Sequence, residues 1–413
     1  MTKAAVGVVG FDEALRTVLE HAADLAAPAT ERVPLLAASG RVLAEAVSAD
    51  RDQPPFDRST RDGFAVRASE FGGNSLRIAG QVRAGEQWTG AALESGAAIE
   101  IMTGAPMPEG ADSVVMVEHV ERSDGGIRPL GGRTIRSGEN VVRRGSEAKL
   151  GQVVLAVGTA IEGAEIALAA ACGYSTLAVF RKPAVAIVAT GDELVEIDAK
   201  PELQQIRNSN SYALASLIAR GGGEAVRLPI APDRRPELVE IIRVARRSDL
   251  MLLSGGVSMG EYDLVEEVLQ TLGAEFFFTG VRMQPGKPVV FGRLPATNDL
   301  PAQFFFGLPG NPVSTQVTFH CFVEPLLQAM AGASVRGPRF AQATLAEDAT
   351  GKPGLMQVLP ARLTADRVRP EVTLVRWQGS GDLAANAQAN CYAVLPPEKE
   401  RFAAGDVITI LLR

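Results

Sequence analysis

Three stretches of sequence decide the fold: AVAIVATGDEL at residues 184–194, LMLLSGGVSMG at 250–260 and FFFGLPGNPVS at 304–314. Each begins with a compact apolar run and continues into a glycine-containing polar loop, which is typical of a buried strand followed by a turn. Between the first two, residues 208–220 predict a helix with an asparagine at its N-cap. Because strands and helices alternate, the sequence favours an α/β fold over residues 179–332, a doubly wound, mostly parallel sheet with helices on both faces.

The flanking sequence has a different texture. Residues 1–50 and 148–178 contain apolar periodicity typical of helices, so we expect them to form one mixed N-terminal domain. Residues 51–147, between them, hold short apolar runs broken by glycine, proline and asparagine, which indicates a β-rich inserted domain. Residues 333–413 return to short strands and predict a C-terminal β-barrel-like domain.

Composition excludes several classes of protein. The 41 basic and 48 acidic residues give a formal net charge of −7, so no basic excess exists to neutralise a nucleic-acid backbone. The uncharged apolar run at residues 166–180 is shorter than the ~20 residues that a membrane helix needs. We therefore expect neither nucleic acid nor membrane as a partner.

The cysteines and histidines point to a cytoplasmic protein without a zinc centre. Cys172, Cys321 and Cys391 lie far apart and are odd in number, which suits reduced thiols in a cytoplasm. The three histidines have no spacing typical of a zinc site.

The loops after the three apolar runs are the first candidates for a binding site. Parallel α/β sheets bind ligands beyond the carboxyl ends of their strands, and all three loops leave strands there. Their glycines let the backbone approach a ligand, and amides at a helix start attract anions. The sequence therefore predicts a phosphate or another oxyanion as ligand, against the alternative that the loops are plain connectors.

Charged residues in the same region suggest a divalent cation. Glu193, Asp233 and Asp263 would repel an anionic ligand unless a metal bridged them, and Mg²⁺ is held in this way by carboxylates and phosphate oxygens. Lys287, in the rigid sequence QPGKP, is well placed to hold an anion. Taken one at a time, each could equally be a helix cap or a solvated side chain.

The inserted domain carries two rigid loops of its own, PPFDRSTRDGF at 54–64 and MTGAPMP at 102–108. Their prolines and the Asp-Gly turn indicate ordered, exposed loops that bear charge. Composition leaves open whether they meet a ligand.

Eight strings occurring in order together resemble the molybdopterin molybdenumtransferase family, which includes the MoeA proteins and the gephyrin E-domain. They cover nearly the whole chain, from about residue 10 to residue 395, and are highly specific as a set. The strings are SGRVLAEAVSADRDQPPFDRSTRDGFAVRA, RAGEQW, IMTGAPMPEGADSVVMVE, ENVVRRGSE, IVATGDEL, LLSGGVSMGEYD, MQPGKPVVFG and GLPGNPVS.

The resemblance implies an elongated homodimer of four-domain subunits, with the site between the α/β domain of one subunit and the β-rich domain of the other. It implies insertion of molybdate into adenylyl-molybdopterin, with Mg²⁺-dependent hydrolysis of the adenylate and release of AMP and molybdenum cofactor. The adenylyltransferase of the same pathway is a candidate partner.

Residue by residue, the resemblance assigns catalytic roles to five positions and metal binding to three of these, Glu193, Asp233 and Asp263. Glu147 stands where an aspartate is common in the family. The catalytic set is Asp62, Thr103, Glu193, Asp233 and Asp263, and the ligand-binding set is Ser254, Gly255, Gly256, Ser258, Gly286, Lys287, Pro309, Gly310, Asn311 and Ser380.

Two departures from the family concern the anion. Gln284 stands where many members have a lysine, and Pro360 stands where some have an arginine. Arg282 and Arg362 lie two residues away, and residues two apart on a strand point to the same side, so we expect one of them to compensate.

Three functions compete at this point. The first is the insertase, the second is a molybdopterin adenylyltransferase, which the SGG loop and Asp263 also resemble, and the third is a non-catalytic gephyrin-like scaffold. The presence of all four segments argues against the second, and the retained acids at 62, 193, 233 and 263 argue against the third. Molybdate and tungstate are both compatible with the site.

Overall fold

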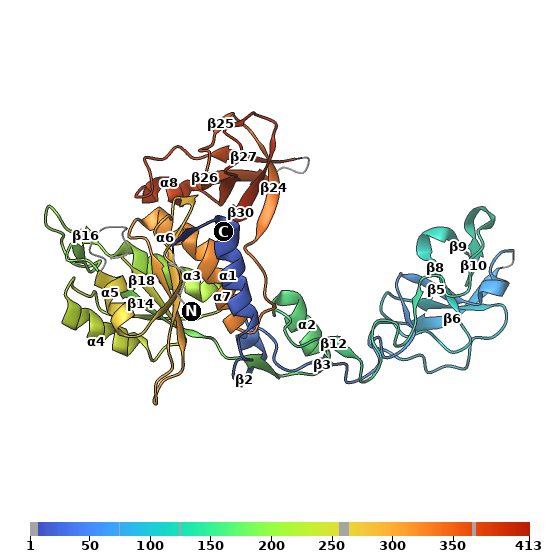
Figure 1. Cartoon of the computed structure of the whole chain (residues 1–413). Coiled ribbons are helices and arrows are strands. Elements are labelled where there is room, and N and C mark those ends of the chain that lie inside the picture. The colour runs from blue at the N-terminus through green and yellow to red at the C-terminus, as the bar shows by residue number, and fades with distance from the viewer. Residues whose placement is uncertain (1–6, 74, 124, 256–263, 366–368) are drawn as a thin grey trace.

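The computed structural model describes residues 7–413 except 74, 124, 256–263 and 366–368. The molecule is elongated: the six-stranded sheet that contains β5 and β6 lies at one end, far from the sheet that contains β14 and β18 (Figure 1). A narrow region with β3, β12 and α2 connects the two ends. None of the described helices is long and apolar enough to cross a bilayer.

A six-stranded sheet in the order β17-β14-β18-β23-β22-β19 forms the α/β part of the chain. The first four strands in this order run parallel, and β22 and β19 join antiparallel. The mostly parallel, doubly wound α/β fold expected from the sequence is thus confirmed. The strands are β14 (Ala184–Ala189), β17 (Glu224–Arg227), β18 (Leu250–Ser254), β19 (Glu275–Phe278), β22 (Val290–Leu294) and β23 (Gln303–Leu308).

Helices cover both faces of this sheet because its strands present apolar side chains to both sides. Ile187, Leu252 and Phe306 face one core, and Val188 and Leu253 face the other. The first face packs against α3 (Ser209–Arg220), α6 (Pro312–Thr318), a π-helical turn (Phe319–Val323) and α7 (Glu324–Met330). The second packs against α4 (Arg235–Ala245) and α5 (Leu264–Thr271).

The beginning of the chain packs against the α/β core. Strand β1 (Val8–Val9) pairs with β20 (Gly280–Val281), and α1 (Phe11–Ala23) buries its apolar face in the first core. The ring of Phe11 lies 5.5 Å from that of Phe322. Helix α1 is amphipathic, as the apolar periodicity predicts. Its apolar face packs against the α/β core rather than against the segments that follow it in sequence.

The rest of the N-terminal part forms a small mixed unit with its own core, in which Leu43, Ile161 and Leu177 are buried. Strand β2 pairs with β13 and β3 pairs with β12, so chain segments on either side of the insertion meet. Its elements are β2 (Thr30–Pro34), a 3₁₀ turn (Leu35–Ala38), β3 (Val47–Ser48), β12 (Val153–Leu155), α2 (Gly163–Ala171) and β13 (Thr176–Phe180).

The inserted part is a six-stranded sheet in the order β8-β5-β7-β6-β10-β9, with a separate apolar core on each side. A short ladder of β4 (Arg58–Ser59) and β11 (Val141–Val142) precedes it along the connecting region. The sheet strands are β5 (Gly63–Val66), β6 (Leu76–Val82), β7 (Ala97–Ile101), β8 (Ser113–Met116), β9 (Val120–Ser123) and β10 (Gly126–Pro129), with short 3₁₀ turns at Ala68–Glu70, Val117–His119 and Leu130–Gly132.

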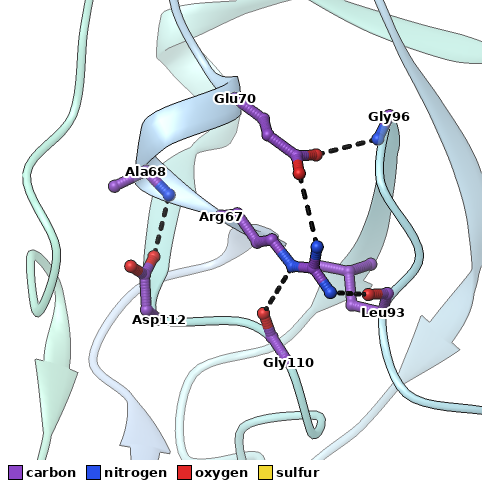
Figure 2. A network of polar contacts seen from close by, with 7 residues as sticks. All are labelled: Arg67, Ala68, Glu70, Leu93, Gly96, Gly110 and Asp112. Carbon is purple, nitrogen blue, oxygen red and sulfur yellow. Dashed lines mark hydrogen bonds and ion pairs between the residues drawn. The ribbon is translucent and has the colours of Figure 1, made fainter.

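A polar network ties the loops of this sheet together (Figure 2). The Arg67 guanidinium donates to the carbonyl oxygens of Leu93 at 2.5 Å and Gly110 at 3.1 Å, and it pairs with Glu70. Glu70 in turn accepts a 2.8 Å hydrogen bond from the amide of Gly96. One arginine therefore satisfies backbone groups of two loops that have no ladder partner at these positions.

The C-terminal part closes into a five-stranded barrel, because β26 pairs with β27 on one side and with β28 on the other. This confirms the barrel-like expectation. The elements are β21 (Met283–Gln284), β24 (Phe340–Leu345), β25 (Ala349–Thr350), β26 (Met356–Ala365), β27 (Pro370–Leu374), α8 (Leu383–Gln388), β28 (Cys391–Leu395), β29 (Arg401–Phe402) and β30 (Val407–Leu412).

Candidate functional site

A cavity of about 940 Å³ lies beyond the carboxyl ends of the parallel strands, where the α/β sheet meets the C-terminal barrel. Its walls come from the loops after β14, β18 and β23, from the turn after β21 and from the loop before α8. A further wall is a short strand, β16 (Ile206–Arg207), which pairs with β15 (Leu194–Val195). A sheet of this kind binds ligands at this edge, so the cavity is the candidate site.

Most residues that the sequence assigned to ligand binding line this cavity. They are Ser254, Gly255, Gly286, Lys287, Pro309, Gly310, Asn311 and Ser380, and the acid Glu193 lines it as well. Gly256, Ser258 and Asp263 lie outside the described residues. Asp233 is exposed and is not among the lining residues, but its amide donates to Asp192 Oδ1 at 3.2 Å, beside the loop that carries Glu193.

The loop after β14 carries the carboxylate of Glu193 at the cavity. Its conformation depends on Gly191, which no other residue can replace without strain. Gly191 has φ +147°, and a Cβ there would lie 2.4 Å from Glu193 Oε2. The Glu193 carbonyl accepts a hydrogen bond from the Ile206 amide at 2.8 Å, which fixes its backbone against β16. The carboxylate itself is exposed to the cavity.

Asparagine side chains connect the walls of the cavity. Asn210, in the first turn of α3, donates to Ser254 Oγ at 3.0 Å and to the Gly310 carbonyl at 2.8 Å. Asn311 donates to Ser380 Oγ at 2.9 Å, which joins the α/β part to the barrel. These bonds hold loops from three distant stretches of sequence in one geometry.

Arg207 and Asn210 line the cavity but were not assigned to a binding site from the sequence. The segment that carries them was interpreted only as the start of a capped helix, and Asn208 does cap α3 by accepting from the Ser211 amide. The Thr190 hydroxyl is buried and has no hydrogen-bond partner among the described residues. A signal was present in the sequence, namely the five consecutive polar residues at 207–211.

The expected compensation by Arg282 or Arg362 is not what the structure shows. Arg282 precedes β21, where its Nη1 donates to the Val8 carbonyl at 3.2 Å, and Arg362 lies on β26 opposite Thr373. Neither lines the cavity. The backbone of Arg282 is also bonded to β1, because its amide donates to the Val9 carbonyl at 2.8 Å.

One arginine of the α/β part is buried. Arg246 is 8% exposed, and its guanidinium donates to the carbonyl oxygens of Pro295 and Pro301. Burial lowers the pKa of this guanidinium. It supports a loop rather than facing water.

Asp62 and Thr103 lie together, but in the inserted sheet. Asp62 Oδ1 accepts from the Thr103 amide at 2.7 Å and from its hydroxyl at 3.0 Å. These bonds, the amide first, lower the pKa of Asp62, so the exposed carboxylate is ionised at neutral pH. Glu147 pairs with Arg58 at 2.9 Å.

Within one chain, β5, which directly follows Asp62, lies at the opposite end of the molecule from β14 and β18, whose loops line the cavity (Figure 1). The fold therefore does not bring Asp62 and Thr103 together with Glu193. Any site that uses both ends must draw on two chains.

The metal site is represented only by separate carboxylates in the described part. Those ranges hold no group of three or more His, Cys, Asp or Glu side chains arranged to hold a metal. Glu193 is nevertheless an exposed carboxylate at the cavity, and Mg²⁺ is commonly bound through one or two such groups together with substrate phosphates. The donor set fits a metal that arrives with its ligand.

Three family profiles match successive parts of the chain: "MoeA N-terminal region (domain I and II)" at residues 9–173, "Probable molybdopterin binding domain" at 186–329 and "MoeA C-terminal region (domain IV)" at 342–412. A curated molybdopterin molybdenumtransferase of Haemophilus influenzae is 34% identical over 92% of this chain and 93% of its own length. The chain belongs to the molybdopterin molybdenumtransferase family. This confirms the resemblance drawn from the eight strings.

Other members of the molybdopterin molybdenumtransferase family agree in sequence and in fold. The Nostoc protein of that name is 39% identical over 73% of this chain and 70% of its own length. A Pyrococcus horikoshii OT3 structure titled "molybdopterin biosynthesis moeA protein" superposes with a TM-score of 0.76, at 28% identity, over 98% of this chain and 100% of that one. A second structure, given as from Pyrococcus horikosii, has a TM-score of 0.71 at 31% identity and covers 98% and 99%.

Proposed function

We propose that the chain inserts molybdate into adenylyl-molybdopterin, with Mg²⁺-dependent hydrolysis of the adenylate and release of AMP and molybdenum cofactor. Membership of the family makes the chain a transferase of molybdenum cofactor biosynthesis. The observation that carries the finer proposal is the cavity itself, in which an acid, a lysine, glycine loops and hydroxyl groups converge from five parts of the sequence.

Each wall of the cavity suits one part of the ligand. The loops at Ser254–Gly255 and Pro309–Asn311 offer amides and hydroxyls of the kind that bind phosphate and pterin polar groups. Lys287 and Ser380 lie on the opposite walls, in the turn after β21 and the loop before α8, where they would hold the incoming oxyanion. Gly286 is fixed by its surroundings, since a Cβ there would lie 2.5 Å from Thr318 Cγ2.

The acids divide into two groups with different tasks. Glu193, with Asp233 and Asp263, would hold Mg²⁺ against the phosphates, and the metal supplies neutralisation of charge at the bond that is cleaved. Asp62 is kept ionised by Thr103 and would orient a ligand group from the inserted sheet.

We propose a homodimer as the working form, in which the inserted sheet of one subunit covers the cavity of the other. The separation of Asp62 from Glu193 within one chain supports this arrangement. The adenylyltransferase of the pathway is a proposed partner, and the three buried free cysteines suit a cytoplasmic location.

The test uses purified protein with adenylyl-molybdopterin, Mg²⁺ and molybdate, and measures AMP and molybdenum cofactor together. Glu193→Gln keeps the shape of the side chain and removes its charge, and should lower AMP release by ~10- to 100-fold, as expected when a metal contact is lost. Glu202→Gln, an exposed residue on the following loop that does not line the cavity, is the matched control. Equal activity in the two variants would contradict the role given to Glu193.

A further inference from the structure

Part of the positive charge at the cavity comes from Arg207, a residue to which the family resemblance assigns no role. A dianion requires cationic donors, and the resemblance places a lysine of many members at Gln284 and an arginine of some members at Pro360. The Gln284 side chain is a neutral acceptor for Gln357 Nε2 at 3.3 Å, and Pro360 pairs with Tyr392 inside the barrel wall. Neither can offer a positive charge.

Among the described residues, Arg207 and Lys287 are the two basic side chains that line the cavity. Both are exposed there, so both remain available to a ligand. Glu193 is the one carboxylate among the described lining residues, and neither basic side chain forms an ion pair with it in the described part of the chain. The basic pair therefore has charge to spare for an anion.

Arg207 is held firmly enough to act as a preformed donor. It lies on β16, whose backbone bonds to the segment that carries Glu193: the Ile206 amide donates to the Glu193 carbonyl and the Asn208 amide to the Val195 carbonyl, at 2.8 and 2.9 Å. Its Nε donates to the Ala199 carbonyl at 3.2 Å. Both terminal amino groups have no partner among the residues that the structure describes, which leaves the bidentate edge of the guanidinium open.

We propose that Arg207 is the second cation of the oxyanion site, where it binds the dianionic substrate together with Lys287 in place of the side chains that Gln284 and Pro360 lack. The inference rests on the proposed function, which supplies molybdate as the anion. A guanidinium presents two parallel donors to a tetrahedral oxyanion, whereas a lysine acts as a point charge, so the two side chains complement each other. Ser380, which also lines the cavity, adds a neutral hydroxyl group.

The test compares Arg207→Gln, Arg207→Lys and Lys287→Ala with the parent protein. Arg207→Gln removes the charge but keeps an amide that can reach the Ala199 carbonyl, so the fold should be retained. We expect the molybdate concentration for half-maximal AMP release to rise about 10-fold or more, which corresponds to ~1.4 kcal/mol or more of binding. Arg207→Lys should recover part of the loss, because the charge returns without the fork.

Two further readouts separate binding from folding. The dissociation constant of adenylyl-molybdopterin measured without molybdate and the melting temperature should both stay at parental values in Arg207→Gln. Arg282→Gln and Arg362→Gln, which remove charges outside the cavity, are the matched controls and should keep the parental molybdate dependence. Weaker binding of the adenylylated pterin with unchanged molybdate dependence would assign Arg207 to the phosphate and overturn the proposal.

Direct titration of molybdate into the protein with the adenylylated pterin bound distinguishes this inference from the proposed function. If the parent protein binds molybdate but Arg207→Gln binds it equally well while Lys287→Ala does not, the inference is wrong and the proposed function stands. If the parent protein binds neither molybdate nor tungstate and releases no AMP, the proposed function fails and the inference fails with it.

Discussion

Replacing Gly191 by alanine should displace the carboxylate of Glu193 from its position at the cavity while leaving the residue itself unchanged. The φ of +147° at Gly191 is accessible to glycine and strained for any other residue, and the added methyl group would lie 2.4 Å from Glu193 Oε2. Backbone strain of this kind costs ~1–3 kcal/mol of folding free energy. The clash itself is relieved cheaply, because the end of the glutamate side chain can swing away.

The functional consequence follows from that movement. With its carboxylate displaced, Gly191→Ala should lose AMP release by about the same ~10- to 100-fold as Glu193→Gln. The double variant should lose hardly more than either single one, because both changes act through the same carboxylate.

The assay pairs chemical denaturation with AMP release at saturating molybdate. Gly151→Ala is the control, since Gly151 also has a positive φ, +78°, but nothing lies within 4 Å of the added Cβ. We expect both alanine variants to lose stability and only Gly191→Ala to lose activity beyond the fraction unfolded. Parental AMP release per folded molecule in Gly191→Ala would refute the link between this glycine and the position of the acid.

Two predictions concern the inserted sheet. Asp62→Ala should leave the melting temperature nearly unchanged and abolish AMP release. Mixing Asp62→Ala subunits with Glu193→Gln subunits should restore part of the activity, because each heterodimer then has one intact composite site. A fully active monomer in sedimentation would rule out the composite site. Glu70 has a pKa lowered chiefly by the hydrogen bond from the Gly96 amide, so its stabilisation is present at neutral pH and is lost as the pH falls below ~4. The denaturation midpoints of the parent and Glu70→Gln should therefore differ at pH 7 and converge towards pH 3, and parallel curves would contradict the assignment.

The sequence by itself determined the elements of the α/β part and most of the cavity loops. Short-range patterns carry this information: a buried parallel strand reads as a continuous apolar run, and the glycine loop that follows it lies at a fixed edge of the sheet. The loops at Glu193, Ser254 and Pro309 were found in this way and do line one cavity. The asparagine before α3 was likewise recognisable as a cap from residue type and position.

Only the tertiary structure decided which distant segments meet. Helix α1 packs its apolar face against the α/β core. The amphipathic pattern predicts that this face is buried, but not which surface covers it. Arg207 lines the cavity because β16, which carries it, pairs with β15. Arg282 instead donates to the carbonyl of Val8 in β1, a contact that the sequence pattern does not predict. Asp62 and Glu193 lie apart because the connecting region is long and narrow. Contacts of this kind depend on long-range packing and pairing, which residue type and spacing do not encode locally.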